Sequence, residues 1–431
     1  MRIYAKNTNS MKINRPVYLQ KLIDRRNNGM IKIITGMRRS GKSYLLFNLF
    51  AARLEDEGID KNHIIAIDLE DIYNEQLREP LPLLQHIDRQ VKEDGTYYVL
   101  IDEVQLLDRF EEVLNTLLKR PNMDVYVTGS NARFLSKDVI TTFRGRGDEV
   151  RVHPLSFGEY LSAQADSGFV ERHLNDYMRL GGLPQTLTMQ NEQQKRDYLQ
   201  QLFKNTYLLD IKERYDIRND DDLEELIDIV ASGIGGLTNP TKITNTFKSV
   251  KQSTIARDTV KNYLDYMQDA FLIEKAVRYD IKGKKYIDTP VKYYFDDLGL
   301  RNARLKFRQT EPAHLMENML YNELRLRGYS VDVGQVTMNV KNEKGRSERR
   351  QLEVDFVCNQ GDKRIYIQSA LMMDNEAKLN QELASLRRID DSFRKVVIAG
   401  GMQPTYLTDE GILIMNIYDF LLSKTDGTID N

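Results

Sequence analysis

The segment 32–46, KIITGMRRSGKSYLL, constrains the fold of this chain more than any other. An apolar run over 31–35 leads directly into a G-x-x-x-x-G-K-S pattern that begins at Gly36 and ends at Ser43. The residues that follow have the spacing of an amphipathic helix. A buried strand, a glycine-bearing loop and a helix in this order are the context that a phosphate-binding loop requires. The sequence therefore predicts a nucleotide-binding fold around this segment.

Each residue type in the loop has a chemical reason to be present. The two glycines let the backbone curl so that its N–H groups point toward an anion, and the next helix directs its N-terminus at the same anion. Lys42 is expected to reach the β- and γ-phosphates of ATP, and Ser43 is expected to bind Mg²⁺. The other positions predicted to line the nucleotide are Gly36, Arg38, Arg39, Ser40, Gly41 and Tyr44.

A second polar motif follows about sixty residues later and strengthens this prediction. Residues 97–101, YYVLI, form a continuous apolar run, as expected for a strand buried on both faces of a parallel sheet. The run ends in Asp102 and Glu103. We expect Asp102 to hold Mg²⁺ through water and Glu103 to polarise the attacking water molecule. The alternative is a surface acidic pair after a core strand.

A third apolar run, 125–127, ends in Thr128, Gly129, Ser130 and Asn131. A polar side chain at the end of this strand would lie beside the γ-phosphate and could respond to its loss. Asn131 is the predicted residue, with Ser130 as the alternative.

The order of the patterns indicates the fold class. Strand and helix patterns alternate, which predicts an α/β domain with a parallel sheet and helices on both faces. Ligands of such sheets bind at the carboxyl ends of the strands, where all three polar motifs fall. The predicted strands are 31–35, 64–69, 97–101 and 125–128, and the predicted helices are 42–57, about 80–92, and 109–119.

A loop over 142–147 carries Arg144 and Arg146. An arginine on such a loop can contact the γ-phosphate, either in its own subunit or from a neighbouring subunit of a homo-oligomer. Arg146 is the favoured candidate, and the alternative is a solvated basic loop.

Composition restricts the class of protein. The 431 residues suffice for about three domains, and 29% charged with 41% hydrophobic residues is ordinary for a globular protein. A single cysteine, Cys358, excludes a disulfide framework within the chain and favours a reducing compartment. No apolar run approaches the roughly 18 residues of a membrane span. We therefore expect a cytoplasmic protein that does not enter a membrane.

Together the motifs resemble those of a prokaryotic group of AAA-type ATPases. The residues that carry the resemblance are the phosphate loop with its Arg38-Arg39 pair, LIDEVQLL at 100–107, TGSN at 128–131 and PLSFGEY at 154–160. The resemblance implies Mg²⁺-dependent ATP hydrolysis. It also implies four domains: an ATPase core over 1–160, a helical lid over 161–236, a winged helix-turn-helix over 237–309 and a domain similar to restriction endonucleases over 310–431.

The third region has its own pattern. Helices are predicted at 241–249 and 257–268, followed by a hairpin of strands 271–277 and 291–295, which is the order of a winged helix-turn-helix. Residues 241–310 carry 15 Lys+Arg against 8 Asp+Glu, a net charge of +7 in a chain whose net charge is −2. This basic character favours contact with DNA phosphates. The alternative is a winged helix that packs against protein.

The last region is similar to a restriction-endonuclease core. Active nucleases of that fold hold Mg²⁺ with carboxylates and use a lysine, and the matching positions here are Glu317, Asp355, Gln368 and Ala370. Because alanine stands where the lysine belongs, we expect a degenerate domain that does not cleave DNA. Two alternatives to an ATPase with multiple turnovers remain. One is an ATP-dependent DNA-processing nuclease, and the other is a slow nucleotide-dependent switch that acts through protein partners.

Overall fold

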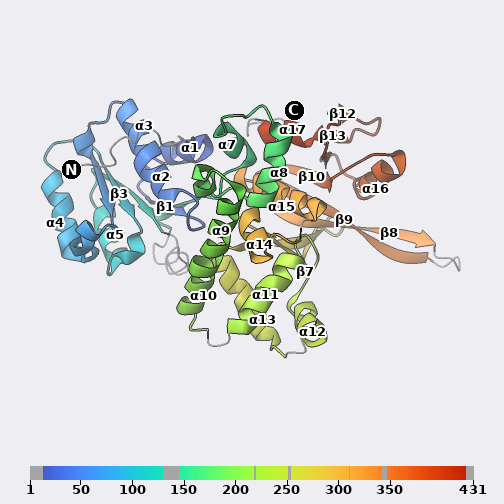
Figure 1. Cartoon of the computed structure of the whole chain (residues 1–431). Coiled ribbons are helices and arrows are strands. Elements are labelled where there is room, and N and C mark those ends of the chain that lie inside the picture. Colours follow the sequence, from blue (N-terminus) through green and yellow to red (C-terminus); the bar gives the residue numbers. More distant parts are fainter. Residues whose placement is uncertain are drawn as a thin grey trace. The chain divides into compact units, whose positions relative to one another are not determined.

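The computed structural model describes residues 13–129, 145–217, 220–250, 254–309, 311–341 and 347–423. The chain divides into two compact units (Figure 1). Unit 1 comprises residues 1–155 with two short later segments, 183–188 and 269–271. Unit 2 comprises 156–182, 189–268 and 272–431.

Unit 1 contains a five-stranded sheet in the order β2-β3-β4-β1-β5, and every neighbouring pair is parallel. The predicted strands are therefore confirmed, and the structure adds β5 at the edge beside β1. Because the strands are parallel, the residues that follow β1, β3 and β4 lie at one edge of the sheet. The strands are β1 (Ile31–Thr35), β2 (Ile64–Asp68), β3 (Tyr97–Asp102), β4 (Met123–Thr128) and β5 (Gly147–Arg151).

Helices cover both faces of this sheet. Isoleucines and valines of β1 to β4 form one core with the apolar sides of α4 and α5, and on the other face the Phe50 ring contacts the Tyr126 ring of β4 at 4.5 Å between centroids. The helices are α1 (Pro16–Asp24), α2 (Lys42–Tyr44), α3 (Ala51–Asp56), α4 (Pro80–Gln90) and α5 (Phe110–Leu118). A π-helical stretch, η1 (Leu45–Phe50), joins α2 to α3, and short 3₁₀ turns are η2 (Lys61–His63), η3 (Ile72–Arg78), η4 (Val104–Leu106) and η5 (Pro184–Thr188).

One residue of the predicted apolar strand 31–35 is a lysine, and its burial has a clear cause. Lys32 is fully buried and forms an ion pair with Asp124 of the neighbouring strand β4. The hydroxyl of Tyr126 donates to the other oxygen of Asp124 at 2.9 Å. A buried charge is tolerated when it is paired and hydrogen-bonded in this way.

Unit 2 contains a mixed eight-stranded sheet in the order β12-β13-β11-β10-β9-β8-β6-β7. Its strands are β6 (Ile273–Asp280), β7 (Lys285–Phe295), β8 (Ser330–Lys341), β9 (Ser347–Gln360), β10 (Lys363–Ala370), β11 (Arg394–Ala399), β12 (Tyr406–Leu407) and β13 (Leu413–Asn416). The sequence analysis did not foresee β12, β13 or the helix that follows them.

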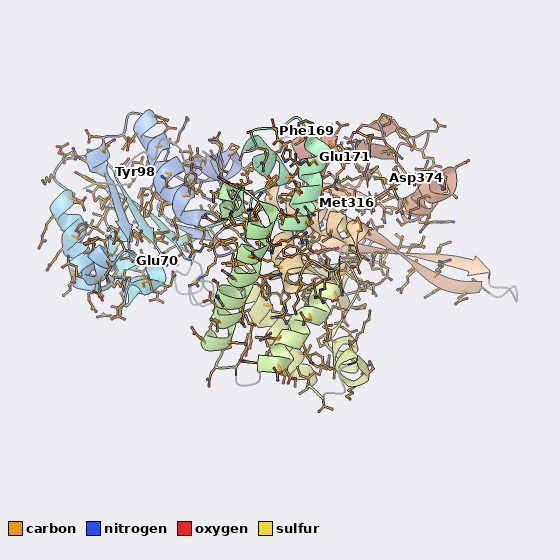
Figure 2. The ribbon with its side chains drawn as sticks, in the orientation of Figure 1. Glu70, Tyr98, Phe169, Glu171, Met316 and Asp374 are labelled. Atoms are coloured by element: carbon orange, nitrogen blue, oxygen red, sulfur yellow. The ribbon has the colours of Figure 1, made fainter. Side chains whose placement is uncertain are left out.

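Some helices of unit 2, such as α15 and α16, pack on this sheet, whereas α10 to α13 form a group of their own (Figure 1). Met316 of α15, labelled in Figure 2, is among their fully buried residues. The helices are α7 (Phe157–Ser162), α8 (Val170–Leu180), α9 (Glu192–Leu202), η6 (Phe203–Leu208), α10 (Leu209–Arg214), α11 (Asp220–Ser232), α12 (Pro240–Val250), α13 (Arg257–Asp269), α14 (Leu298–Arg304), α15 (Pro312–Leu326), α16 (Glu376–Leu386) and α17 (Ile417–Leu422).

The hairpin expected as the wing of a winged helix is present, but it is not a separate wing. Strands β6 and β7 pair with each other, and β6 also pairs with β8 in parallel register from Arg278 opposite Val333. The hairpin is therefore the edge of the same sheet that contains β8 to β13. The domain boundary expected at residue 309 falls inside one compact unit, because the sheet crosses it.

The short helix α14 joins distant parts of unit 2. The carboxylate of Asp297 at its N-terminus accepts hydrogen bonds from the Gly182 and Leu300 N–H groups, at 2.8 and 2.9 Å. A Cβ atom on Gly181 would lie 2.4 Å from the same carboxylate, and Gly181 has a φ of +75°. Gly181, predicted only as part of a helix stop, is thus also required for close packing.

Candidate nucleotide site

The first loop glycine is required for a close approach of two backbones. A Cβ atom on Gly36 would lie 2.1 Å from the carbonyl oxygen of Val152, and Gly36 has a φ of +128°. Gly41 has a φ of +93° immediately before the helix that begins at Lys42. Both positions therefore require glycine, although Gly36 does so for packing as well as for the curl of the loop.

Lys42 lies inside the loop rather than at its surface. Only 4% of the residue is exposed, and its ammonium donates to the carbonyl oxygens of Gly36 and Met37, both at 3.0 Å. Burial lowers the pKa of Lys42 to about 8, while the nearby charges of Glu103 and Asp102 oppose this decrease. The structure thus brings the predicted lysine and the predicted acidic pair together.

Asp102 is the last residue of β3, is 3% exposed and is linked to the loop. The hydroxyl of Ser43 hydrogen-bonds to its carboxylate, and so does the hydroxyl of Thr128, the last residue of β4. Burial raises the pKa of Asp102 to about 6, and these two hydrogen bonds oppose the increase. A hydroxyl and a carboxylate side by side are a ligand set that suits Mg²⁺.

Glu103 has a backbone conformation that is rare for its residue type. Its φ is +51°, in the left-handed region that disfavours residues with a Cβ atom. The Glu103 N–H donates to the hydroxyl of Thr128 at 2.9 Å, and its carboxylate accepts from the side chain of Gln105. Strained backbone of this kind is concentrated at functional sites.

The sequence analysis missed Arg15, which is 3% exposed. Its guanidinium donates to the carbonyl oxygen of Ser40 at 2.9 Å and to that of His153 at 2.8 Å. It also lies over the ring of Tyr18, whose hydroxyl accepts from the His153 N–H at 3.0 Å. Arg15 therefore ties the phosphate loop to the segment after β5. No motif signalled it, because its partners are backbone carbonyls distant in sequence.

The remaining predicted loop residues differ in exposure. Ser40 is fully buried, whereas Arg38 and Tyr44 are half-buried and Arg39 is exposed with a φ of +63°. The charge of Arg38 contributes to lowering the pKa of Lys42, so it lies near the ammonium. Their contacts with a nucleotide stay predictions.

Of the residues predicted to contact or sense the γ-phosphate from the third strand end and the arginine loop, the structure describes Arg146 alone. Asn131, its alternative Ser130, and Arg144 lie outside the described residues. Arg146 is exposed, and its carbonyl oxygen accepts from the N–H of Ile31 at 2.9 Å. Ile31 begins β1 and the phosphate loop follows its end, so the five-residue strand separates them by roughly 15 Å. We therefore predict contact of Arg146 with a γ-phosphate only for the nucleotide of a neighbouring subunit.

Comparisons with known proteins agree with this geometry. Residues 28–161 match the family described as an AAA domain. Residues 28–161 therefore form a domain of the AAA type. Residues 171–311 match a domain of unknown function (DUF8612), which spans the regions predicted as lid and winged helix.

Two relatives extend beyond the AAA domain. An uncharacterized protein of Haemophilus influenzae is 33% identical over 414 residues, covering 95% of this chain and 98% of that protein, and the two belong to one family. An uncharacterized protein of Methanocaldococcus jannaschii is 28% identical over 360 residues, covering 80% and 74%. The crystal structure of Cdc6p from Pyrobaculum aerophilum has 11% identity and a TM-score of 0.30, covering 73% of this chain and 96% of that one.

The carboxylates expected from the nuclease resemblance do meet, but around an ammonium. Lys292 of β7 is 1% exposed, and its Nζ lies 2.7 Å from Glu317, 2.6 Å from Glu353 and 4.0 Å from Asp355. The hydroxyl of Tyr294 donates to Glu317 at 2.6 Å. Burial, with the charge of Glu317, raises the pKa of Asp355 to about 8. We call these four ionisable residues, Lys292, Glu317, Glu353 and Asp355, the Lys292 cluster.

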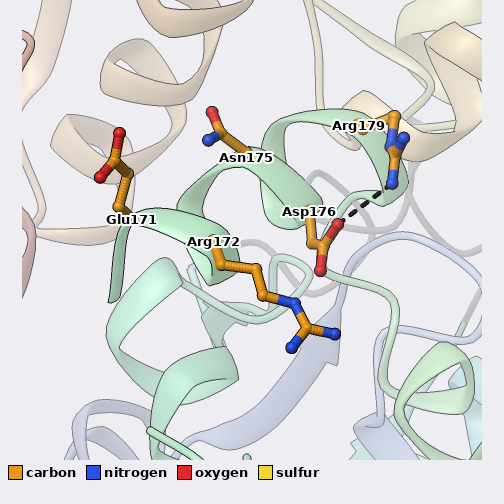
Figure 3. A pocket seen from close by; sticks show the side chains of 5 residues that line it. All are labelled: Glu171, Arg172, Asn175, Asp176 and Arg179. Atoms are coloured by element: carbon orange, nitrogen blue, oxygen red, sulfur yellow. Dashed lines mark hydrogen bonds and ion pairs between the residues drawn. The ribbon is translucent and has the colours of Figure 1, made fainter. Parts of the chain in front are cut away.

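Unit 2 also has an open polar cavity of about 440 Å³ along α8. Figure 3 shows its five lining side chains, Glu171, Arg172, Asn175, Asp176 and Arg179, on one helix. Arg179 pairs with Asp176 at 3.1 Å, and it also pairs with Glu192.

In the described ranges no helix has the length and apolar character needed to cross a membrane.

Proposed function

We propose that unit 1 binds ATP with Mg²⁺ and hydrolyses it. The observation that carries this proposal is the meeting of Lys42, Ser43, Asp102 and Glu103 at the carboxyl edge of one parallel sheet. Phosphate-binding enzymes of this class act by positioning and by electrostatic stabilisation, and these residue types suffice for both. The match of residues 28–161 to an AAA domain supports the same activity.

Each residue has a distinct role in this proposal. Lys42 donates to the β- and γ-phosphate oxygens in place of the loop carbonyls that it now contacts. Ser43 and Asp102 would hold Mg²⁺, which supplies positive charge to the phosphate oxygens when bound. Glu103 accepts a proton from the attacking water molecule and orients it. The nearby charges of Asp102 and Glu103 keep Lys42 protonated to a higher pH than burial alone would allow.

The pKa values define a pH window for this chemistry. The Asp102 carboxylate loses its proton above about pH 6, and the Lys42 ammonium keeps its proton below about pH 8. Between these values both groups carry the charges that the proposal needs. A slow nucleotide-dependent switch would use the same site and would differ only in its rate of turnover. The nuclease alternative is not favoured, because Ala370 stands where the lysine of that fold belongs, and because the Lys292 ammonium already lies against Glu317 and Glu353.

The experiment that tests the proposal is ATP hydrolysis by the full chain beside titration with a fluorescent ATP analogue. Lys42→Ala removes a charge-assisted donor, so we expect nucleotide affinity to fall about 10- to 100-fold. Lys61→Ala, which removes a lysine whose side chain is 78% exposed in the same unit, is the matched control. Unchanged affinity in Lys42→Ala, with circular dichroism showing a folded protein, would remove the basis for a phosphate loop.

We also propose that exposed basic residues of unit 2 contact DNA phosphates. Not all of the predicted positive charge is available, because Lys292 and Arg301 are buried. Three lysines at the β6–β7 turn, Lys282, Lys284 and Lys285, are exposed. Exposed Lys248 and Lys261 lie on α12 and α13. This concentration of unburied positive charge in an otherwise acidic chain supports the proposal.

Replacing Lys282, Lys284 and Lys285 together by glutamate should weaken DNA binding. Each lost phosphate contact should reduce the slope of log affinity against log salt concentration by about 0.9. Fluorescence anisotropy with labelled duplex DNA over a salt series measures both quantities. A control in which Lys61 becomes glutamate should bind as the wild type does. Equal slopes in the triple variant and the wild type would contradict a role of this turn.

A further inference from the structure

Thr128 links the two acidic residues of the nucleotide site through a single hydroxyl group. It is the last residue of β4 and is fully buried. Its hydroxyl donates to Asp102 and accepts from the Glu103 N–H at 2.9 Å. A hydroxyl has one donor and two acceptor positions, so one group can satisfy both neighbours at once.

The hydrogen bond from the Glu103 N–H to the Thr128 hydroxyl lies at a residue with an unfavourable backbone conformation. Glu103 follows directly after β3, and its φ of +51° turns the chain out of the strand. The Glu103 N–H lies beyond the last paired residues of β3 and β4, and the Thr128 side chain accepts its hydrogen bond. The backbone conformation at Glu103 determines the direction in which its carboxylate leaves the strand. The Thr128 hydroxyl therefore acts on the carboxylate indirectly, through the backbone.

The first bond acts on Asp102. The Thr128 hydroxyl and the Ser43 hydroxyl both donate to this carboxylate, and both lower its pKa against the effect of burial. Because the Thr128 hydroxyl donates its proton to Asp102, its oxygen can only accept further hydrogen bonds. It accepts one from the Glu103 N–H. The orientation of the hydroxyl is thus fixed by both neighbours.

We propose that Thr128 is a positioning residue for ATP hydrolysis, which fixes Glu103 and Asp102 relative to each other through its hydroxyl. This inference rests on the proposed ATPase function. Residues that support a site from behind typically change activity by about 10- to 100-fold when they are replaced. The hydrogen bonds of the Thr128 hydroxyl in the described part of the chain go to these two acids, so nucleotide affinity should change much less than kcat.

Two matched pairs of variants isolate the hydroxyl. Thr128→Val keeps the shape of the side chain and removes the hydroxyl, whereas Thr128→Ser and Thr128→Ala both lack the methyl group and differ only in the hydroxyl. We expect kcat to fall about 10- to 100-fold in the Val and Ala variants and to be largely restored in Ser. Thr116→Val, which removes an exposed helix hydroxyl that bonds to the Glu112 carbonyl, is the control.

Two further measurements do not depend on hydrolysis. Hydrogen exchange of the Glu103 N–H should be faster in Thr128→Val and near the wild-type rate in Thr128→Ser. The affinity for a fluorescent ATP analogue with Mg²⁺ should stay near the wild-type value in Thr128→Val, because the hydroxyl bonds to the two acids and not to the loop. Wild-type kcat in Val, equal impairment of Ser and Ala, or unchanged exchange would overturn the proposal. Absence of hydrolysis by the wild type would reject the ATPase function. The exchange and binding results would then test separately whether the Thr128 hydroxyl fixes the two acids.

Discussion

Glu103→Gln should bind ATP as the wild type does and hydrolyse it at least ~10²-fold more slowly, because an amide cannot accept a proton from water. The substitution changes little else at this position. The backbone N–H still donates to Thr128, and the amide oxygen can still accept from the Gln105 side chain. The effect should therefore appear in kcat rather than in the affinity for the nucleotide. Phosphate release under saturating ATP measures the first, and fluorescent analogue titration measures the second.

The matched control is Glu75→Gln, which removes an exposed carboxylate in the same unit. Its hydrolysis rate should equal that of the wild type. If Glu103→Gln also hydrolyses ATP at the wild-type rate, another residue is the base. If the wild type itself binds ATP tightly but turns it over slowly, the switch alternative replaces the ATPase, and Glu103→Gln will have little further effect.

Lys292→Met should destabilise unit 2 by about 3–5 kcal/mol, the usual cost of removing one partner from a buried ion pair. The variant would leave the carboxylates of Glu317, Glu353 and Asp355 without their common counter-ion. Burial alone would lower the pKa of Lys292, but the charges of these carboxylates raise it above its usual range, so the ammonium stays charged at neutral pH. Urea unfolding followed by circular dichroism measures the change in the free energy of unfolding.

Two variants show whether the charge is responsible. Lys275→Met removes an exposed lysine from β6, opposite Tyr293 of β7, and should cost little. Adding Glu317→Gln to Lys292→Met removes one of the unpaired charges and should recover part of the lost stability. A loss below about 1 kcal/mol in Lys292→Met would mean that the cluster does not behave as a buried ion pair.

Local patterns in the sequence predicted which residues the candidate nucleotide site would bring together, where the site is built from contiguous residues. The spacing from Gly36 to Ser43 and the strand that ends at Asp102 both depend on chain-local signals, namely glycine conformations and runs of apolar residues. The order of strands and helices then predicted a parallel sheet. Since parallel strands end at a common edge, the meeting of Lys42 with the acidic pair followed without knowledge of the tertiary structure.

Other features depended on contacts between residues far apart in the chain. Arg15 binds carbonyl groups at 40 and 153, and backbone carbonyls leave no signal in a sequence. Thr128 was noted only as part of a polar strand end, whereas pairing of β3 with β4 brings its hydroxyl to both acids. The position of Arg146 at the start of β1 likewise follows from the pairing of β5 with β1.

In unit 2 local patterns predicted α12, α13 and the β6–β7 hairpin, because hydrophobic periodicity and turn residues are local, but they did not predict β12, β13 or α17. Only the tertiary structure decided that the β6–β7 hairpin joins the sheet of the C-terminal region, since strand pairing depends on which backbone edges meet. That pairing also places Lys292 among Glu317, Glu353 and Asp355. The lysine that was counted as part of a basic surface is instead buried and paired with Glu317 and Glu353, because a buried ammonium needs a paired carboxylate.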